Sequence, residues 1–184
     1  MREDEMGSSS KGAPRRISAD VIAASAAFLI ALAIAEGYAP TVVTTKNDPV
    51  PTGGFGSTKN EAGQPLKVGE AMSPVRALIV LREHVGRDES AFRASLPGVS
   101  LTQGEYDVYL DFFYQYGIGA WSRSSMRTAL LSGEYRAACD ALLKYRYSNG
   151  ADCSAPGNRT CAGVWTRQQA RHRKCLAEQG EGDA

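Results

Sequence analysis

The stretch ALAIAEGYAPTVVTTKNDPVPTGGFGST, residues 31–58, decides the fold because the character of the chain changes within it. It begins inside an alanine-rich segment that carries no charge after Asp20, and Glu36 and Gly37 end that segment. β-Branched residues then favour a strand over residues 41–45, and Asn-Asp-Pro at residues 47–49 is typical of a turn. The residues that follow, 50–56, favour a second short strand with glycine bends. The stretch therefore predicts a helix that leads into a small β-hairpin or three-stranded patch.

Helical signals dominate the chain after a polar loop at residues 60–69. Ser73 followed by Pro74 is typical of a helix N-cap with proline at the first helical position, and this helix is expected to run to Glu83. Four more helices are expected: one that begins near Leu101, with Tyr106, Tyr109 and Phe113 at helical spacing, and others over residues 124–131, 133–147 and 165–177. The sequence thus predicts an α+β fold that is mostly α.

Composition fits one globular domain rather than a charged binding module. The chain has 184 residues, of which 43% are hydrophobic and 22% charged, and its net charge is +1. Bulk charge therefore favours neither nucleic acid nor acidic lipid as a partner. Residues 159–174 contain five basic and no acidic residues, which indicates a locally cationic face, either solvated or suited to anionic cell wall. The glycines of residues 53–56 are not followed by Lys-Ser or Lys-Thr, so we expect no nucleotide binding.

Four cysteines, Cys139, Cys153, Cys161 and Cys175, lie in the last third of the chain. Neither histidine stands at zinc-ligand spacing from them, so we expect no metal site. An even number of cysteines behind an export-like N-terminus indicates two disulfides, for which three pairings exist. A polar loop at residues 154–158 would bring Cys153 back to Cys161, which leaves Cys139 and Cys175 to join two helices. We favour this nested pairing over four reduced thiols in a cytosolic protein.

The uncharged residues 21–35 allow three interpretations. Residues 1–16, a polar tail that we expect to be disordered, end in Arg15 and Arg16, and the apolar helix is expected over residues 17–35. A conventional membrane anchor needs about 20 strongly apolar residues. A cleaved signal peptide would fit the Ala-Ile-Ala at residues 33–35. The third interpretation is a weakly apolar helix that enters the membrane uncleaved and later leaves it.

Glu36, Asp48 and Thr52 are the candidate catalytic residues. Glycoside hydrolysis needs one carboxyl group that donates a proton to the leaving oxygen and a second group that activates the attacking water. The apolar helix behind Glu36 is expected to desolvate its carboxyl group and so raise its pKa. Asp48, in the turn, and Thr52 could hold the water by hydrogen bonds. From the residues alone, a solvated helix end and an ordinary turn explain the same pattern.

Several motifs, in the same order along the chain, resemble those of the phage lysozyme family, glycoside hydrolase family 24. Residues 36–38 and 50–58 are similar to the family's E-G-[aromatic] and P-T-x-G-[aromatic]-G-x-T motifs. Glu105-Tyr106-Asp107, residues 113–121 and residues 163–175 resemble later motifs. The resemblance runs from about residue 20 to Cys175. It implies a two-lobed lysozyme-like fold, with the active site in a β-lobe at residues 36–69, a helical lobe at residues 70–178 and a disordered tail at residues 179–184.

What the resemblance implies for chemistry is hydrolysis of the β-1,4 bond between N-acetylmuramic acid and N-acetylglucosamine in bacterial peptidoglycan, with inversion and without a cofactor. Glu36 would be the general acid, and Asp48 and Thr52 would hold the attacking water. The family's aspartate lies closer to its glutamate than Asp48 does, and the residues at the usual spacing are Thr45 and Lys46. A lytic transglycosylase, which needs no such carboxylate, and an inactive wall-binding module are therefore the alternatives.

The resemblance also favours one interpretation of the apolar segment. Some exported members of the family begin with an alanine-rich signal-arrest-release helix that runs directly into the catalytic glutamate. Cleavage after Ala35 would remove the helix that positions Glu36, so we expect an uncleaved segment. The expected protein is a monomer in the periplasm of the bacterial host, tethered at first to the inner membrane by residues 21–35.

Overall fold

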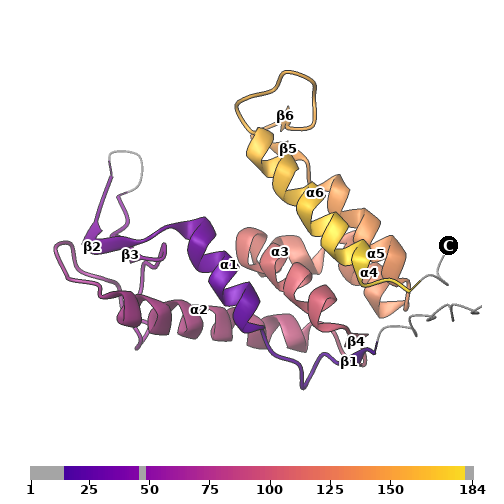
Figure 1. The fold of residues 1–184 in the computed structure, drawn as a ribbon, viewed down its shortest axis with the longest axis horizontal. Helices are drawn as coiled ribbons and strands as arrows, with labels where there is room; N and C mark the ends of the chain where they lie inside the picture. The colour runs from indigo at the N-terminus through magenta and orange to yellow at the C-terminus, as the bar shows by residue number, and fades with distance from the viewer. Residues whose placement is uncertain (1–14, 46–48, 181–184) are drawn as a thin grey trace, which may run out of the picture.

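The computed structural model describes residues 15–45 and 49–180. Helix α1 (Ala26–Glu36) leads into a hairpin of β2 (Ala39–Val43) and β3 (Thr52–Gly54), and together with the loop that follows, the hairpin forms the β-lobe (Figure 1). The long helix α2 (Pro74–Ala94) runs from the β-lobe to the helical lobe. The helical lobe consists of α3 (Gln103–Ser122), α4 (Ser125–Leu131), α5 (Tyr135–Ala141), the 3-10 helix η1 (Leu142–Lys144) and α6 (Ala162–Ala177). The predicted α+β fold with helices in the majority is confirmed.

Helix α1 is shorter than the sequence predicts. It begins at Ala26, because the Ser25 hydroxyl accepts a hydrogen bond from the Phe28 N–H at 3.0 Å and caps the helix there. Residues 15–24 are not helical. Residues 17 and 18 form strand β1 (Ile17–Ser18), which pairs antiparallel with β4 (Ser100–Leu101). The prediction of one helix over residues 17–35 is therefore wrong for its first half, where bonds to distant parts of the chain outweigh the helical preference of an alanine-rich sequence.

Two other helices end elsewhere than predicted. Helix α2 continues to Ala94 instead of Glu83, and its later turns bury Val85 and Phe92 in the core. The predicted helix over residues 133–147 is broken instead into α5, η1 and a tight hairpin of β5 (Tyr147–Ser148) and β6 (Ala151–Asp152). Ser73 does cap α2, with Pro74 in the first turn as predicted.

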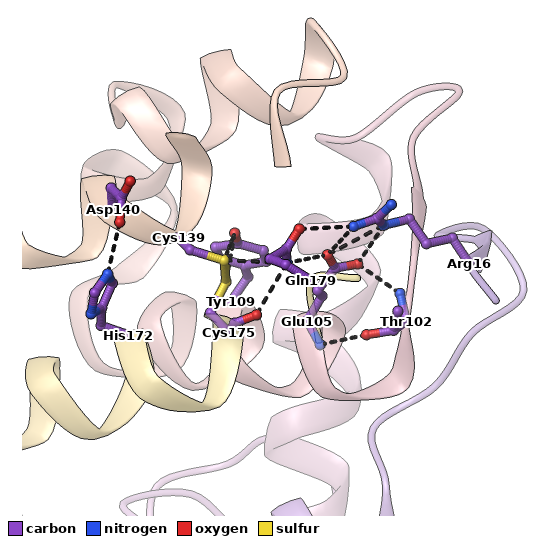
Figure 2. The surroundings of a disulfide bond; sticks show 9 residues. All are labelled: Arg16, Thr102, Glu105, Tyr109, Cys139, Asp140, His172, Cys175 and Gln179. Atoms are coloured by element: carbon purple, nitrogen blue, oxygen red, sulfur yellow. Dashed lines mark hydrogen bonds and ion pairs between the residues drawn. A yellow bond between two sulfur atoms is a disulfide. The ribbon is translucent and has the colours of Figure 1, made fainter. Parts of the chain in front are cut away.

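The predicted tails at residues 1–16 and 179–184 reach too far into the chain. Arg16 pairs with the buried carboxylate of Glu105 at 2.8 Å, and Gln179 donates to the same carboxylate at 2.8 Å (Figure 2). Both residues therefore belong to the folded domain. Arg15 and Gly180 are also described. The rest of the two predicted tails, residues 1–14 and 181–184, lies outside the described residues.

The main hydrophobic core lies in the helical lobe and is centred on aromatic rings. Trp121 is fully buried, its ring lies 5.0 Å from that of Phe92, and its indole N–H donates to Ser95 at 2.7 Å. A second, smaller cluster lies in the β-lobe and consists of Val42, Leu66, Met72 and Ala77, with Phe55 packed against it. The two lobes therefore have separate cores of very different size.

Two disulfides join the cysteines in the predicted pairing. Cys139 on α5 is bonded to Cys175 on α6, with the two Cα atoms 5.5 Å apart. Cys153 is bonded to Cys161 across the loop before α6, with a Cα–Cα distance of 5.1 Å. The nested pairing is confirmed, and both bridges lie in the helical lobe.

The basic residues 159–174 do not form one solvated cationic face. Arg167 and the buried Arg171 both turn toward Asp111 of α3, at 2.9 and 2.6 Å respectively. Together the two guanidinium groups hold the pKa of Asp111 below its usual range, although burial of that carboxyl opposes the shift. These arginines therefore join α6 to α3, and only part of the basic stretch is free to meet an anionic partner.

Candidate active site

Glu36 is the last residue of α1. Gly37 ends the helix in the left-handed region, at φ 71°, and its N–H donates to the Ala33 carbonyl at 3.2 Å. The chain then turns directly into β2. The helix end thus carries Glu36 to the edge of the β-lobe, as the sequence predicts.

The carboxylate of Glu36 lies against the backbone of Gly56. A Cβ atom placed on Gly56 would lie only 2.8 Å from Oε2 of Glu36. Gly56 also has φ +70°, a backbone angle that residues other than glycine rarely adopt. The β2–β3 pairing explains the approach, because Ala39, three residues after Glu36, is opposite Gly54, two residues before Gly56. Glycine at position 56 leaves the space that the catalytic candidate occupies.

Tyr38 fixes the turn that follows Glu36. Its ring lies 5.5 Å from that of Phe55, and its hydroxyl donates to the Met72 carbonyl at 2.5 Å. Met72 belongs to the small core of the β-lobe and stands just before α2. The aromatic residue of the Glu36-Gly37-Tyr38 motif therefore connects the active-site turn to the start of the interlobe helix.

Tyr114 of α3, in the helical lobe, is affected by the charge of the same carboxylate. Burial raises the pKa of Tyr114 to about 12, and the negative charges of Glu36 and Asp88 add to the shift. Glu36 is therefore near enough to act on the phenol by its charge. The carboxylate thus lies close to Gly56 of the β-lobe, and its charge also acts on Tyr114 of the helical lobe.

Thr52 is the first residue of β3 and is half-buried. Its hydroxyl donates to the Val50 carbonyl at 3.0 Å. The hydroxyl proton is thus engaged, and the oxygen lone pairs stay available to accept a hydrogen bond. Asp48 lies outside the described residues, so the structure places Glu36 and Thr52 in the β-lobe and gives no position for Asp48.

The environment of Glu36 differs from the one expected from the sequence. Helix α1 buries Phe28, Leu32 and Ala33, whereas Glu36 itself is exposed to solvent. The expectation that an apolar wall desolvates this carboxyl group is therefore wrong for the protein without substrate. The reason is geometric, because α1 is packed on one side only and its last turn projects beyond the core. Within residues 15–45 and 49–180, no cluster of acidic, histidine or cysteine side chains could hold a metal ion.

The family model for phage lysozyme matches residues 33–171, which include Glu36, Thr52, Gly56 and Tyr114. The chain belongs to the phage lysozyme family. It is accordingly a lysozyme, a glycosidase that hydrolyses bacterial peptidoglycan. The resemblance seen in the ordered motifs is thereby confirmed.

Solved structures confirm the lysozyme-like fold. An endolysin from the Escherichia coli O157:H7 phage FAHEc1 is 21% identical, with a TM-score of 0.70, over 85% of this chain and 94% of that one. A variant of the phage P22 lysozyme is 22% identical, with a TM-score of 0.69, over 85% of this chain and 99% of that one. The active form of the P1 phage endolysin Lyz is 17% identical, with a TM-score of 0.66, over 85% and 86%. No curated protein matches the chain by sequence.

Sequence analysis named Glu36 and Thr52 as candidates but missed Gly56, which lies against Glu36, and Tyr114, on which the charge of Glu36 acts. Both stand inside motifs that the sequence displayed, at residues 50–58 and 113–121. A motif shows that a residue type is required, whereas only the fold shows which residue it meets. The approach of Glu36 to Gly56 depends on the strand register, which the sequence left open.

Proposed function

We propose that this lysozyme cuts the β-1,4 bond between N-acetylmuramic acid and N-acetylglucosamine by an inverting reaction in which Glu36 is the general acid. The observation that carries the proposal is the position of the Glu36 carboxylate, exposed at the helix end and close to Gly56. Among the described residues, this carboxylate forms no ion pair. Bound glycan would cover it, and loss of water favours the protonated acid.

In this proposal, Thr52 orients the attacking water and Asp48 deprotonates it. Because the Thr52 hydroxyl donates to Val50, it receives a hydrogen bond from the water and so orients the water's oxygen toward the sugar. Asp48 is the base that removes the second proton. An inverting enzyme needs about 6.5–9.5 Å between its two carboxyl groups to admit the water. We expect a cleft between the β-lobe and the helical lobe to provide that space.

Analysis of the sugar ends that the enzyme releases tests the reaction. Purified peptidoglycan is digested and the first products are observed by NMR before the anomers interconvert. Inversion predicts a new α-anomeric reducing end, whereas a β-anomer would indicate retention. A 1,6-anhydro-muramoyl end would identify a lytic transglycosylase instead and would overturn the proposed hydrolysis.

The water-holding residues are tested by a matched pair of substitutions. Thr52→Ser keeps the hydroxyl and should keep most of the turnover, whereas Thr52→Val keeps the shape and should lose it. Asp48→Asn should also reduce hydrolysis, by about 10²–10⁴-fold if Asp48 is the general base. Full activity of Asp48→Asn would remove Asp48 from the mechanism and leave Thr52 alone with the water.

The second part of the proposal is a transient tether to the inner membrane of the bacterial host through residues 21–35, before action in the periplasm. Support comes from the outward face of α1, which carries no charge and exposes Ile30 at 59% and Ile34 at 77%. No helix among the described residues has the length and apolarity to cross a bilayer. Residues 21–35, if fully helical, would extend about 22 Å, less than the roughly 30 Å of a hydrocarbon core, so the proposed residence is weak and reversible.

Fractionation of expressing cells tests the tether with two opposite changes on exposed positions. Leucine at Ala23 and Ala26 should increase the share of protein in the membrane pellet and delay lysis. Lysine at Ile30 should shift the protein to the soluble fraction, because a charge within the segment opposes membrane entry. If both variants fractionate like the wild type, the segment has no membrane role.

A further inference from the structure

The Glu105-Tyr106-Asp107 motif at the start of α3 takes no part in the proposed chemistry, although it resembles a family signature. Each of its three side chains is connected by hydrogen bonds to residues 16–25, the segment that precedes α1. Glu105 and Asp107 contact that segment directly, and Tyr106 contacts it through Glu89 of α2. The motif therefore contacts the residues that lead into α1, the helix that ends in Glu36.

Glu105 holds the beginning of this segment. Its carboxylate is 1% exposed and pairs with Arg16 at 2.8 Å (Figure 2). The Arg16 guanidinium also lies 3.7 Å from the centre of the Tyr135 ring. Gln179 and the Thr102 N–H donate to the same carboxylate, each at 2.8 Å. Residues 17 and 18 then pair with β4, directly before α3. The first residues of the segment are thus attached to the base of α3.

Asp107 and Glu89 hold the end of the segment. Asp107 accepts hydrogen bonds from the Ser25 N–H at 3.1 Å and from the Ser25 hydroxyl at 2.5 Å. Glu89, also buried, accepts from the Ala24 N–H and from the Tyr106 hydroxyl, each at 2.7 Å. Helix α1 has no acidic residue in its own first turn. Its positive N-terminal end is therefore stabilised by carboxylates that α2 and α3 supply.

We infer that Glu89, Glu105 and Asp107 form a docking site for residues 16–25 which sets the position of α1 and hence of Glu36. They are positioning residues for catalysis. The inference rests on the proposed role of Glu36 as the general acid. In the proposed tethered state, residues 21–25 lie in the membrane and cannot make these bonds, so docking and tethering exclude each other.

The length of α1 makes Glu36 sensitive to this docking. Eleven residues at about 1.5 Å each place Glu36 roughly 16 Å from Ser25, so a tilt of about 5° moves the carboxylate by more than 1 Å. Misplacement of about 1 Å can lower a reaction rate by about 10²-fold. A bond at the start of the helix can therefore act on chemistry at its end.

Packing alone does not hold α1 on all sides. A pocket of about 300 Å³ lies between α1, α3 and α6, and the α1 residues that line it include Ala27, Ala31 and Ala35. The small side chains leave this side of the helix without close neighbours. The buried Phe28 and Leu32 border the same pocket, and Ala33 is the other buried residue of α1. The polar bonds at Ala24 and Ser25 are therefore the contacts that define where α1 begins and how it is inclined.

Asp107→Ala tests the inference in the full-length soluble protein. It removes both bonds to Ser25, whereas Asp107 is only half-buried, so the helical lobe is expected to fold. We expect turnover on soluble glycan fragments to fall at least tenfold with little change in KM. Amide hydrogen exchange should speed up in residues 19–36 and stay unchanged in α4–α6. The matched control is Asp140→Ala, another helical-lobe aspartate with one side-chain partner, His172, which should match the wild type.

A second substitution separates docking from a general loss of stability. Ser25→Ala removes the hydroxyl bond to Asp107 and the cap on Phe28, and should also lower turnover. The double variant Ser25→Ala/Asp107→Ala should lose less than the two single losses added together, since the bond between the two side chains is already lost in each single variant. Full turnover and unchanged exchange in Asp107→Ala would overturn the inference. Equal acceleration of exchange throughout the chain would also overturn it, by showing a purely structural role. A wild-type protein that cleaves no glycan would refute the proposed function instead.

Discussion

The β-lobe and the helical lobe differ in what holds them together. The β-lobe has a core of Val42, Leu66, Met72 and Ala77, and its active-site turn depends on glycines that meet other groups closely. The helical lobe has a continuous aromatic core around Trp121 and contains both disulfides. The comparison indicates that the groups proposed for chemistry belong to the lobe with the smaller core and without a disulfide. Changes in the active-site turn of the β-lobe should therefore act first on activity, and changes in the core or the disulfides of the helical lobe first on stability.

The largest expected effect on activity is that of Glu36→Gln, in the group proposed for chemistry. The substitution removes the proposed proton donor and should lower turnover by about 10²–10⁴-fold. Because Glu36 is exposed, the free energy of unfolding should change by less than about 0.5 kcal/mol. Clearing of cell-wall suspensions and urea unfolding measure the two quantities. A variant that still clears walls at nearly the wild-type rate would show that the acid lies elsewhere.

Removal of the Cys139–Cys175 disulfide should have the largest effect on stability. It closes a sequence separation of 36 residues against 8 for Cys153–Cys161. Chain-entropy arguments give losses of about 4 and about 2.5 kcal/mol for the two bridges. The paired alanine variants are compared by urea unfolding, with activity measured well below the transition. If the shorter bridge proved the more stabilising, loop closure would not be the reason that the helical lobe is stable.

Gly56→Ala should be the reverse case, a β-lobe change that costs more activity than stability. The new methyl group would displace the Glu36 carboxylate, and we expect turnover to fall by about 10²-fold. The left-handed backbone should cost about 1 kcal/mol of stability. Gly63→Ala is the matched control, because Gly63 has φ +78° but nothing within 4 Å of the added atom. Equal losses of activity in the two variants would show that backbone strain alone is responsible.

The smallest effect is expected where α1 meets the helical lobe. Ala31→Leu should place part of a larger side chain in the pocket between α1, α3 and α6 and stabilise the soluble protein by about 1 kcal/mol. Ala26→Leu, at an exposed position outside that pocket, should change stability by less than about 0.5 kcal/mol. Thermal unfolding of the two purified variants makes the comparison. A destabilised Ala31→Leu would mean that the pocket cannot accept the added carbons.

Local signals predicted what local interactions determine. Ser73-Pro74 placed the start of α2, and the polar loop at residues 154–158 indicated that Cys153 is bonded to Cys161. The end of the apolar helix placed Glu36 at the edge of the β-lobe. In each case the residues that decide the structure lie within about ten positions of one another, where spacing and residue type are informative.

Features that depend on distant partners were not predictable in the same way. Residues 17–25 look helical, but Glu89 and Asp107, more than sixty positions away, hold them in another conformation. The exposure of Glu36 depends on how much of α1 the core covers, which periodicity in an alanine-rich segment does not show. The role of Asp48 stays a prediction, because it depends on a turn outside the described residues.

The site around Glu105 has a consequence for the order in which the protein can be completed. Arg16 reaches Glu105 across 89 positions and Gln179 across 74, from opposite directions along the chain. The ribosome delivers Gln179 last, after every other group that binds this carboxylate. A nascent chain that still lacks α6 can therefore bury Glu105 only with its amide partner missing and with Cys139 unbonded. Vectorial synthesis thus leaves the helical lobe unfinished until α6 and Gln179 have emerged.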